Sequence, residues 1–470
     1  MKKYASILAV LVLLLGFAAL SYAAPAEIPS DTTAVIAKGK TQITLGGDLR
    51  FRGFHGKNLQ VKANDTYTDS QANYDYRVRL SLEAKVSPNT TGFVELESGD
   101  FKKDSVIWGS ENGGGRGVYD YGNTKESNVT IRQAWIQYQG TGLLGVPAGI
   151  KVGRQLLKLG YGIFYDHTYF GDDAIVVFVQ PMKELTLAAF TIKWSEGSHT
   201  TKSPDLNDDS TGYGILAAYA GKGFGLSADI SHLDHQNINN SGKAGTFPDI
   251  HFWNFGLRGN VDDIAGTGLN FKADVEFQTG KIKEDISTPR EKKYRGWAAM
   301  AGLDYKFKTF PLSLTLEYAI GSGDKNSTRD KNENFITALG QEQHYTFVYE
   351  FLTPTACKID GSYGKRTGIC NTQYVKFGGA YDIIKDLKAE LYGYWLRAHR
   401  AVAIIDKSPT ATPDRDLGWE VDAKVTYKID KGLTYWIEGG YFWPGDAYKV
   451  SPTKDADDAW AVRHGIQLKF

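Results

Sequence analysis

The stretch Tyr76-Arg-Val-Arg-Leu-Ser-Leu-Glu-Ala-Lys-Val86 alternates without a break between apolar and polar side chains. Successive side chains of a β-strand point to opposite faces of the sheet, so this stretch predicts a strand with one apolar and one charged face. The same split recurs at 269–278 and 419–429. The repetition indicates a sheet that separates an apolar from a polar environment.

Weaker copies of this pattern occupy most of the remaining chain. Tight connectors such as 221–223 and 385–386 alternate with long polar stretches such as 101–127 and 323–372. Short periplasmic turns and long extracellular loops are typical of outer-membrane barrels. We therefore predict an all-β protein, a transmembrane antiparallel β-barrel of about 18 strands, with 16 as the alternative count. The expected strands lie near 41–54, 74–87, 91–100, 128–139, 147–159, 174–180, 185–195, 210–221, 223–234, 249–261, 267–281, 294–308, 311–322, 373–384, 387–400, 416–429, 432–443 and 459–470.

The start of the chain indicates export. Lys2 and Lys3 precede an apolar run at 7–20, and small residues follow it up to Ala23, as in a secretory signal peptide. We expect a signal peptide at 1–23, a short periplasmic segment at 24–40 and an outer-membrane barrel at 41–470. The run Ala174 to Val179, the longest apolar run after residue 23, is far shorter than the ~20 residues of a membrane-spanning helix.

The composition excludes other classes of protein. The chain has 54 basic and 54 acidic side chains. It therefore lacks the basic excess that binding to nucleic-acid phosphates requires. The soluble alternative, a β-sandwich array or propeller, is disfavoured because no fixed repeat of about 40–50 residues is present. It also leaves unexplained the final strand, which ends on Phe470 and resembles the assembly signal of bacterial outer-membrane barrels.

A barrel of this size encloses a lumen too wide for side chains to fill, so its inward residues decide what passes. Closure places the last strand beside the first, which would gather arginines of the polar parity into one basic wall. The alternative is that these arginines form ion pairs with Asp48, Asp75 and Glu83 that only stiffen the barrel. The predicted basic residues of the pore are Arg50, Arg52, Arg77, Arg79 and Arg463.

Acidic side chains of the same parity complete the predicted lining. We expect those of the third strand and of the late strands to lie across the lumen from the basic wall, so that the pore carries a transverse field. The predicted acidic residues are Asp48, Glu83, Glu95, Glu97, Glu420, Asp422 and Glu438. Arg154 is expected to face inside through a bulge. The parity of 128–139 stays open, since Trp135 and Ile136 are both large.

Two connections differ from ordinary loops. The segment 161–173 is aromatic, glycine-rich and acidic, and is either a selectivity loop folded into the channel or a loop covering the rim. The segment 323–372 is long enough to be a lid or plug, and export predicts a disulfide between Cys357 and Cys370 within it. Its aromatic residues at 345–351 either stack on sugar rings or pack the loop against the barrel. No metal site is expected, because Asp166 and its acidic neighbours lack a calcium-loop spacing.

Two motifs resemble a known family. The run 131–138, Ile-Arg-Gln-Ala-Trp-Ile-Gln-Tyr, followed by Val-Gly-Arg-Gln-Leu-Leu-Lys-Leu-Gly-Tyr-Gly at 152–162, is similar to the alginate-export family of outer-membrane porins. The resemblance implies eighteen strands, a basic pore and folded-in loops that pass an anionic polysaccharide. It also implies that Arg132 and Arg154 belong to the basic constriction.

The expected function is passive diffusion of small hydrophilic solutes through the outer membrane, with preference for anionic or oligosaccharide solutes. The alternative is a barrel sheath that houses a partner such as a cytochrome in an electron conduit. An enzyme is not expected, because no nucleophile motif accompanies the scattered histidines, and no cofactor is expected either. The expected partners are outer-membrane lipid, the solutes and a protein in the lumen or periplasm, and not nucleic acid.

Overall fold

The computed structural model describes residues 35–38, 41–59, 70–98, 106–107, 110–111, 114–115, 129–142, 144–195, 209–235, 249–283, 291–325, 330–339, 345–353, 368–402 and 412–470. The predicted signal peptide at 1–23 and Cys357 lie outside these residues, so the peptide and the disulfide stay predictions. The described residues contain no helix long and apolar enough to cross a membrane.

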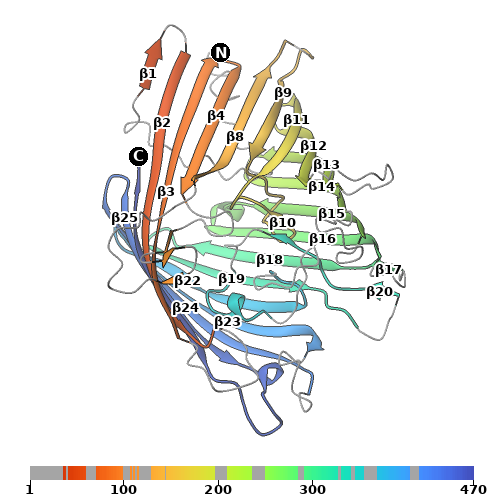
Figure 1. Ribbon diagram of the computed structural model, residues 1–470, viewed down its shortest axis with the longest axis vertical. Helices are drawn as coiled ribbons and strands as arrows, with labels where there is room; N and C mark the ends of the chain where they lie inside the picture. Colours follow the sequence, from red (N-terminus) through yellow and green to blue (C-terminus); the bar gives the residue numbers. More distant parts are fainter. Residues whose placement is uncertain are drawn as a thin grey trace.

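Eighteen strands form a closed antiparallel ring in the described residues, each paired with its neighbours along the chain. β26 pairs with β2 from Asp48↔Lys469 to Lys57↔Trp460, which closes the ring where the red and blue ends of the chain meet (Figure 1). The ring consists of β2 (Thr41–Lys57), β3 (Ser70–Ser87), β4 (Thr90–Ser98), β8 (Val129–Gly140), β9 (Ala148–Gln155), β11 (Asp172–Met182), β12 (Leu185–Ser195), β13 (Ser210–Gly221), β14 (Phe224–His235), β15 (Asp249–Val261), β16 (Leu269–Lys283), β18 (Trp297–Lys306), β19 (Leu312–Gly321), β22 (Thr372–Ile384), β23 (Leu387–Val402), β24 (Asp414–Asp430), β25 (Leu433–Pro444) and β26 (Ala459–Lys469).

Each ring strand corresponds to one predicted segment, so the fold class and the strand count are confirmed. The main differences are in length, since β2 continues to Lys57 and β3 begins at Ser70. Short turns such as 183–184 and 222–223 lie at one end of the ring together with Thr41 and Phe470, and the long connections lie at the other. By the general layout of outer-membrane barrels, the short-turn end faces the periplasm.

Smaller elements accompany the ring. β1 (Val35–Lys38) pairs with the first residues of β2 and lies within the predicted N-terminal segment. β5 (Val106–Ile107), β6 (Ser110–Glu111), β7 (Gly114–Gly115), β17 (Glu291–Tyr294) and β20 (Lys331–Asn332) lie in the long connections, as do the 3-10 helices η2 (Tyr349–Phe351) and η3 (Asp446–Tyr448), while η1 (Ile264–Gly266) lies in the turn between β15 and β16.

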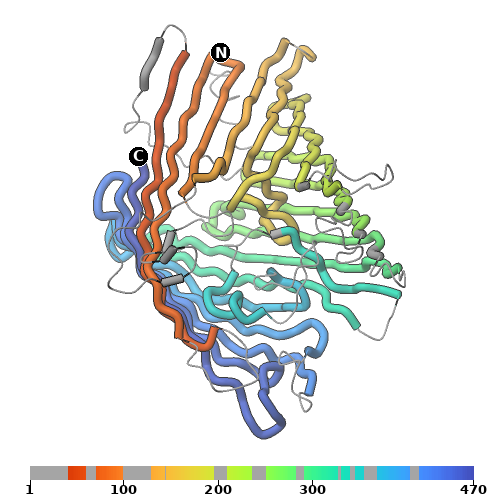
Figure 2. The backbone as a smooth tube through the Cα atoms, viewed as in Figure 1, coloured from red at the N-terminus to blue at the C-terminus, as the bar shows by residue number. Residues whose placement is uncertain are grey.

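The apolar core lies inside the ring, where two connections fold against the wall. β10 (Tyr165–Asp166), from the connection between β9 and β11, pairs in parallel with β21 (Ala338–Leu339), from the connection between β19 and β22 (Figure 2). Phe164 and Tyr165 pack in one buried cluster with Val176, Phe252 and other wall residues. The two connections therefore support each other within the lumen.

Candidate functional site

The strands present charged side chains to the inside of the ring and apolar side chains to the outside. In β3, Leu80 and Leu82 are exposed outward, whereas Asp75 and Arg77 are buried on the opposite parity. In β24, Trp419 and Val421 are exposed, and Glu420 between them is 1% exposed. We call the charged parity the inner face. Many of its polar groups hydrogen-bond to one another or to the folded-in loops.

Five arginines of the inner face are held by carboxylates on neighbouring strands. The Arg52 Nε lies 3.0 Å from an Asp75 oxygen, and the Arg77 Nη2 lies 3.0 Å from an Asp48 oxygen. Arg79 pairs with Glu97. Arg132 pairs with Glu95 at 2.6 Å, and Arg463 pairs with Glu438 at 2.5 Å.

The structure places these arginines together and pairs most of them with carboxylates. The arginines share one region of the wall, from β25–β26 through β2, β3 and β4 to β8. The ion pairs with Asp48 and Asp75 form as the alternative interpretation expected. Glu83 lies closer to the short turn, opposite Thr44 and Phe93, and is half-buried. Arg50 lies directly opposite Arg77 in the β2–β3 register, which places like charges side by side.

The predicted acidic residues do not all lie across the lumen from this region. Glu95 and Glu97 contact Arg132 and Arg79, and Glu438 contacts Arg463 and, at 3.1 Å, Lys424. The reason is the antiparallel pairing of consecutive strands, which puts each carboxylate beside the arginine of the adjacent strand. For these residues the expectation of a transverse separation is wrong.

A bulge in β8 settles which of its side chains face inside. The β4–β8 register shifts between Glu95 and Leu96, leaving Arg132 as the extra residue. Arg132 and Gln133 are both buried, Trp135 is inner, and Ile136 is 66% exposed on the outside. The Arg132 guanidinium also donates to the carbonyl oxygens of Thr168 (2.5 Å) and Tyr169 (3.0 Å). The bulge thus aims Arg132 at the folded-in loop.

Arg154 lies on the opposite face from the one expected. It continues the outward parity of Ile150 and Val152, and it faces Asp173 across the β9–β11 pair. The Arg154 Nη1 lies 3.0 Å from an Asp173 oxygen, and that Asp173 side chain is 60% exposed. Gly153 has φ 120° but causes no register shift, so no bulge turns Arg154 inward. Lys151 is the inner cation of β9, and its Nζ lies 3.9 Å from the Trp135 ring centroid.

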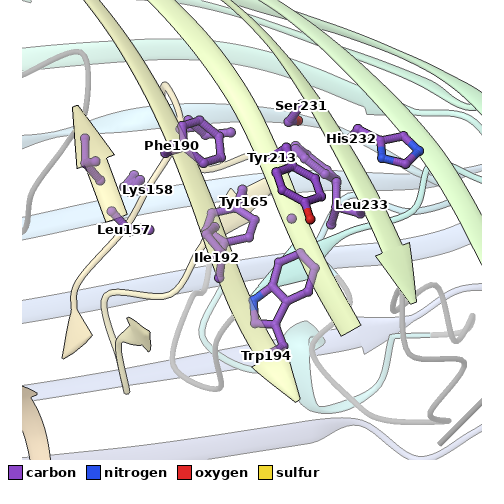
Figure 3. Close-up of a pocket in the computed structure, with 14 residues that line it drawn as sticks. Leu157, Lys158, Tyr165, Phe190, Ile192, Trp194, Tyr213, Ser231, His232 and Leu233 are labelled. Atoms are coloured by element: carbon purple, nitrogen blue, oxygen red, sulfur yellow. The ribbon is translucent and has the colours of Figure 1, made fainter. Parts of the chain in front are cut away.

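The connection 156–171 folds into the ring, as the selectivity-loop interpretation expected. Its Tyr161 N–H donates to Asp274 Oδ2 at 3.2 Å, on the inner face of β16. At its base, Asp172 accepts hydrogen bonds from the Tyr165 hydroxyl (2.6 Å) and the Trp194 ring (3.1 Å), and it contacts His167 Nδ1 (2.7 Å). Figure 3 shows Tyr165 beside Ile192 and Trp194. The loop is thereby held at Tyr161 and again near its C-terminal end.

A buried cluster that the sequence interpretation missed holds the far side of this loop. Arg258 forms ion pairs with Asp229, Asp274 and Glu276, and all four side chains are almost fully buried. Arg258 also lies directly opposite Asp274 in the β15–β16 register. The alternating pattern on both strands could have revealed that pair, because a short turn joins them. Asp229 comes from the other neighbouring strand, β14.

The connection containing 345–353 is anchored by the carboxylates of β24. Glu420 accepts hydrogen bonds from the backbone N–H groups of Phe347 (2.8 Å), Val348 (2.6 Å) and Tyr349 (2.7 Å). Asp422 accepts a second bond from the Phe347 N–H at 3.0 Å. Glu420 and Asp422 are therefore inner-face residues whose immediate partner is a loop.

The aromatic residues of this loop pack against the barrel. Tyr345 stacks on Tyr374 with centroids 4.5 Å apart, and Tyr349 is fully buried. Burial raises the pKa of the Tyr349 phenol, which stays neutral and shares a 2.7 Å hydrogen bond with Thr372. The ring of Phe347 contacts one of the arginines, since the Arg463 guanidinium lies 5.3 Å from its centroid. Among the described residues, no group of His, Cys, Asp and Glu side chains could hold a metal ion.

Comparisons with known proteins agree with this architecture. A family described as alginate export matches residues 41–462. Among curated proteins, no match is found. The solved structure of Pseudomonas aeruginosa OccK9 (OpdG) is 12% identical, with a TM-score of 0.52, covering 91% of this chain and 98% of that one. OccD1 (OprD) is 10% identical, with a TM-score of 0.50, covering 96% and 98%. The closed ring, its apolar exterior and the family place the protein in the bacterial outer membrane.

Proposed function

The chain belongs to the alginate export family, and from this premise we propose that it is a channel for passive diffusion of small hydrophilic solutes, with a preference for anionic solutes or oligosaccharides. The observation that carries the proposal is the row of arginines on adjacent strands of the inner face. A guanidinium has five N–H donors, and a carboxylate engages two of them in a fork. A paired arginine such as Arg463, whose side chain is 24% exposed, can still donate to a passing anion.

The folded-in loops favour a channel over a sheath. The segments 156–171 and 345–353 both contact the inner face, through Asp274 and Glu420 respectively. A cytochrome or other protein inside the ring would have to share the lumen with them. Small solutes need only a path between loop and wall.

Replacing Arg50, Arg52, Arg77 and Arg79 together with glutamine should lower the preference for anions. The substitutions remove four positive charges, including the ion-pair partners of Asp48 and Asp75 and one of the two of Glu97, so cations become favoured. We expect the anion-to-cation permeability ratio to fall on the order of tenfold, as local ion concentration follows the field. Reversal potentials in planar bilayers under a salt gradient measure this ratio.

Two controls accompany this experiment. Lysine at the same four positions retains the charge and should keep the selectivity of the wild type. Glutamine at the outward-facing Arg154 and Arg397 removes positive charge from the outer face and should leave the ratio unchanged. If the glutamine variant of the wall keeps the wild-type ratio, the arginines are structural and the proposed anion preference fails.

A further inference from the structure

One arginine of the inner face is more open to the lumen than the others. The side chain of Arg463 is 24% exposed, whereas those of the other four paired arginines are 7–13% exposed. Its Nε and Nη2 groups contact Glu438, and in the described part of the chain no hydrogen bond engages its Nη1 group. Because a guanidinium has five N–H donors, Arg463 retains donors for a second acceptor.

The charges around Arg463 favour an anion as that acceptor. Arg463 and Lys424 share a single carboxylate, since the Lys424 Nζ lies 3.1 Å from the other oxygen of Glu438. Arg50 and Lys376 add positive charge to the same inner face. The remaining carboxylates nearby each have a partner of their own, which is an arginine, a lysine or a loop N–H group; they are Asp48, Asp75, Glu390, Glu420 and Asp422.

Three aromatic side chains lie next to Arg463. Its guanidinium is 5.3 Å from the ring centroid of Phe347, and Phe54 is directly opposite it in the β2–β26 register. Trp436 is opposite Gly465, and a Cβ added at Gly465 would lie 2.5 Å from the indole ring. The indole therefore lies over Gly465, a position about 7 Å along the strand from Arg463.

An open guanidinium edge beside aromatic rings suits a carboxylate attached to a flat apolar ring. The carboxylate accepts N–H bonds from the guanidinium, and the ring packs against the faces or edges of neighbouring aromatic side chains. The hydroxyl groups of a sugar would need further acceptors here, whereas Glu438 already accepts from Arg463 and Lys424. A small inorganic anion would use the arginine but gain nothing from the rings.

We propose that Arg463, Phe54, Phe347 and Trp436 form a subsite for aromatic carboxylates on the solute path. The subsite presupposes the proposed channel and names the class of anionic solute that it takes. Arg463 holds the carboxylate, and Phe347 and Trp436 hold the ring. Phe347 is fixed through its backbone N–H, which donates to two carboxylates of β24, so the loop 345–353 contributes directly to the subsite.

The test is block of the chloride current through the intact protein in planar bilayers at neutral pH by sodium benzoate, sodium acetate or sodium galacturonate. In the wild type, benzoate should halve the current at a concentration about tenfold below that of acetate, because its ring packs against aromatic side chains. Phe347→Ala and Trp436→Ala should each raise the benzoate concentration for half block about fivefold and leave that of acetate unchanged. Arg463→Gln should weaken the block by both carboxylates.

Two substitutions serve as controls. Phe347→Tyr keeps the ring and should be blocked like the wild type. Phe377→Ala removes a ring that is 60% exposed on the outside of β22 and should change nothing. Trp436 lies on a strand, so Trp436→Ala decides the result if Phe347→Ala alters the unblocked conductance by moving the loop.

The outcomes separate the subsite from the channel. An anion-selective current that benzoate and acetate block equally would overturn the subsite and leave the proposed function standing. A wild type without current, or with a preference for cations, would overturn both. Galacturonate that blocks as strongly as benzoate would show that the rings do not select aromatic solutes. Preferential block by benzoate that survives both alanine substitutions would also overturn the subsite.

Discussion

Replacing Arg258 with methionine is expected to destabilise the barrel by about 3–5 kcal/mol, the usual cost of removing one partner of a buried charge network. Arg258 is the cation shared by Asp229, Asp274 and Glu276, whose side chains are fully buried. Without it, three carboxylates face one another in an environment that water does not reach. Urea unfolding in detergent micelles, followed by tryptophan fluorescence, measures the change.

The same substitution should loosen the loop 156–171. Asp274 accepts the Tyr161 N–H of that loop, so a displaced Asp274 removes its anchor on β16. Arg258→Lys retains one positive charge without the guanidinium fork, so its stability should lie between those of the wild type and Arg258→Met. Arg397→Met, on the outward parity, is the matched control and should change stability little. An Arg258→Met protein as stable as the wild type would show that the carboxylates carry no charge to be balanced.

Replacing Glu420 with alanine is expected to release the loop 345–353 and raise the single-channel conductance. Glu420 accepts three backbone N–H bonds from Phe347, Val348 and Tyr349. Each bond to a charged acceptor contributes roughly 1.5–3 kcal/mol, so losing all three shifts the loop equilibrium by at least about a thousandfold. Recordings of single channels in planar bilayers measure conductance and the noise of loop motion.

Two variants separate the anchor from its charge. Glu420→Gln keeps a carbonyl oxygen that accepts some of these bonds, so its conductance should lie nearer the wild type. Glu390→Ala removes an inner-face carboxylate of β23 that pairs instead with Lys388 and should leave the loop in place. If alanine at 420 leaves conductance and noise at wild-type values, the loop does not obstruct the path of ions.

Much of the barrel could be predicted because a strand has a period of two. The alternation at 76–86 and 419–429 gives strand positions and faces together, and these held for Arg77, Arg79, Glu420 and Asp422. Consecutive strands joined by short turns also made the neighbours of each strand predictable. The pair of β26 and β2 followed from the expectation that the barrel closes.

The errors arose where the period is interrupted or where loops supply the partner. The bulge in β8 puts Arg132 and Gln133 on the same face, whereas β9 has no shift and leaves Arg154 outside. Glu95 and Glu438 were assigned across the lumen because alternation gives a face but not the distance around the ring. Nothing in the pattern of β24 indicates that Glu420 caps a loop more than seventy positions earlier.

The amino-acid sequence by itself determined the barrel, its strand count and which face of most strands meets lipid, because these depend on the local alternation of apolar and polar side chains. Only the tertiary structure decided which carboxylate holds each arginine, which loops enter the lumen and where Arg154 points. Those outcomes depend on register, bulges and contacts between residues far apart in the chain, and no local period encodes them.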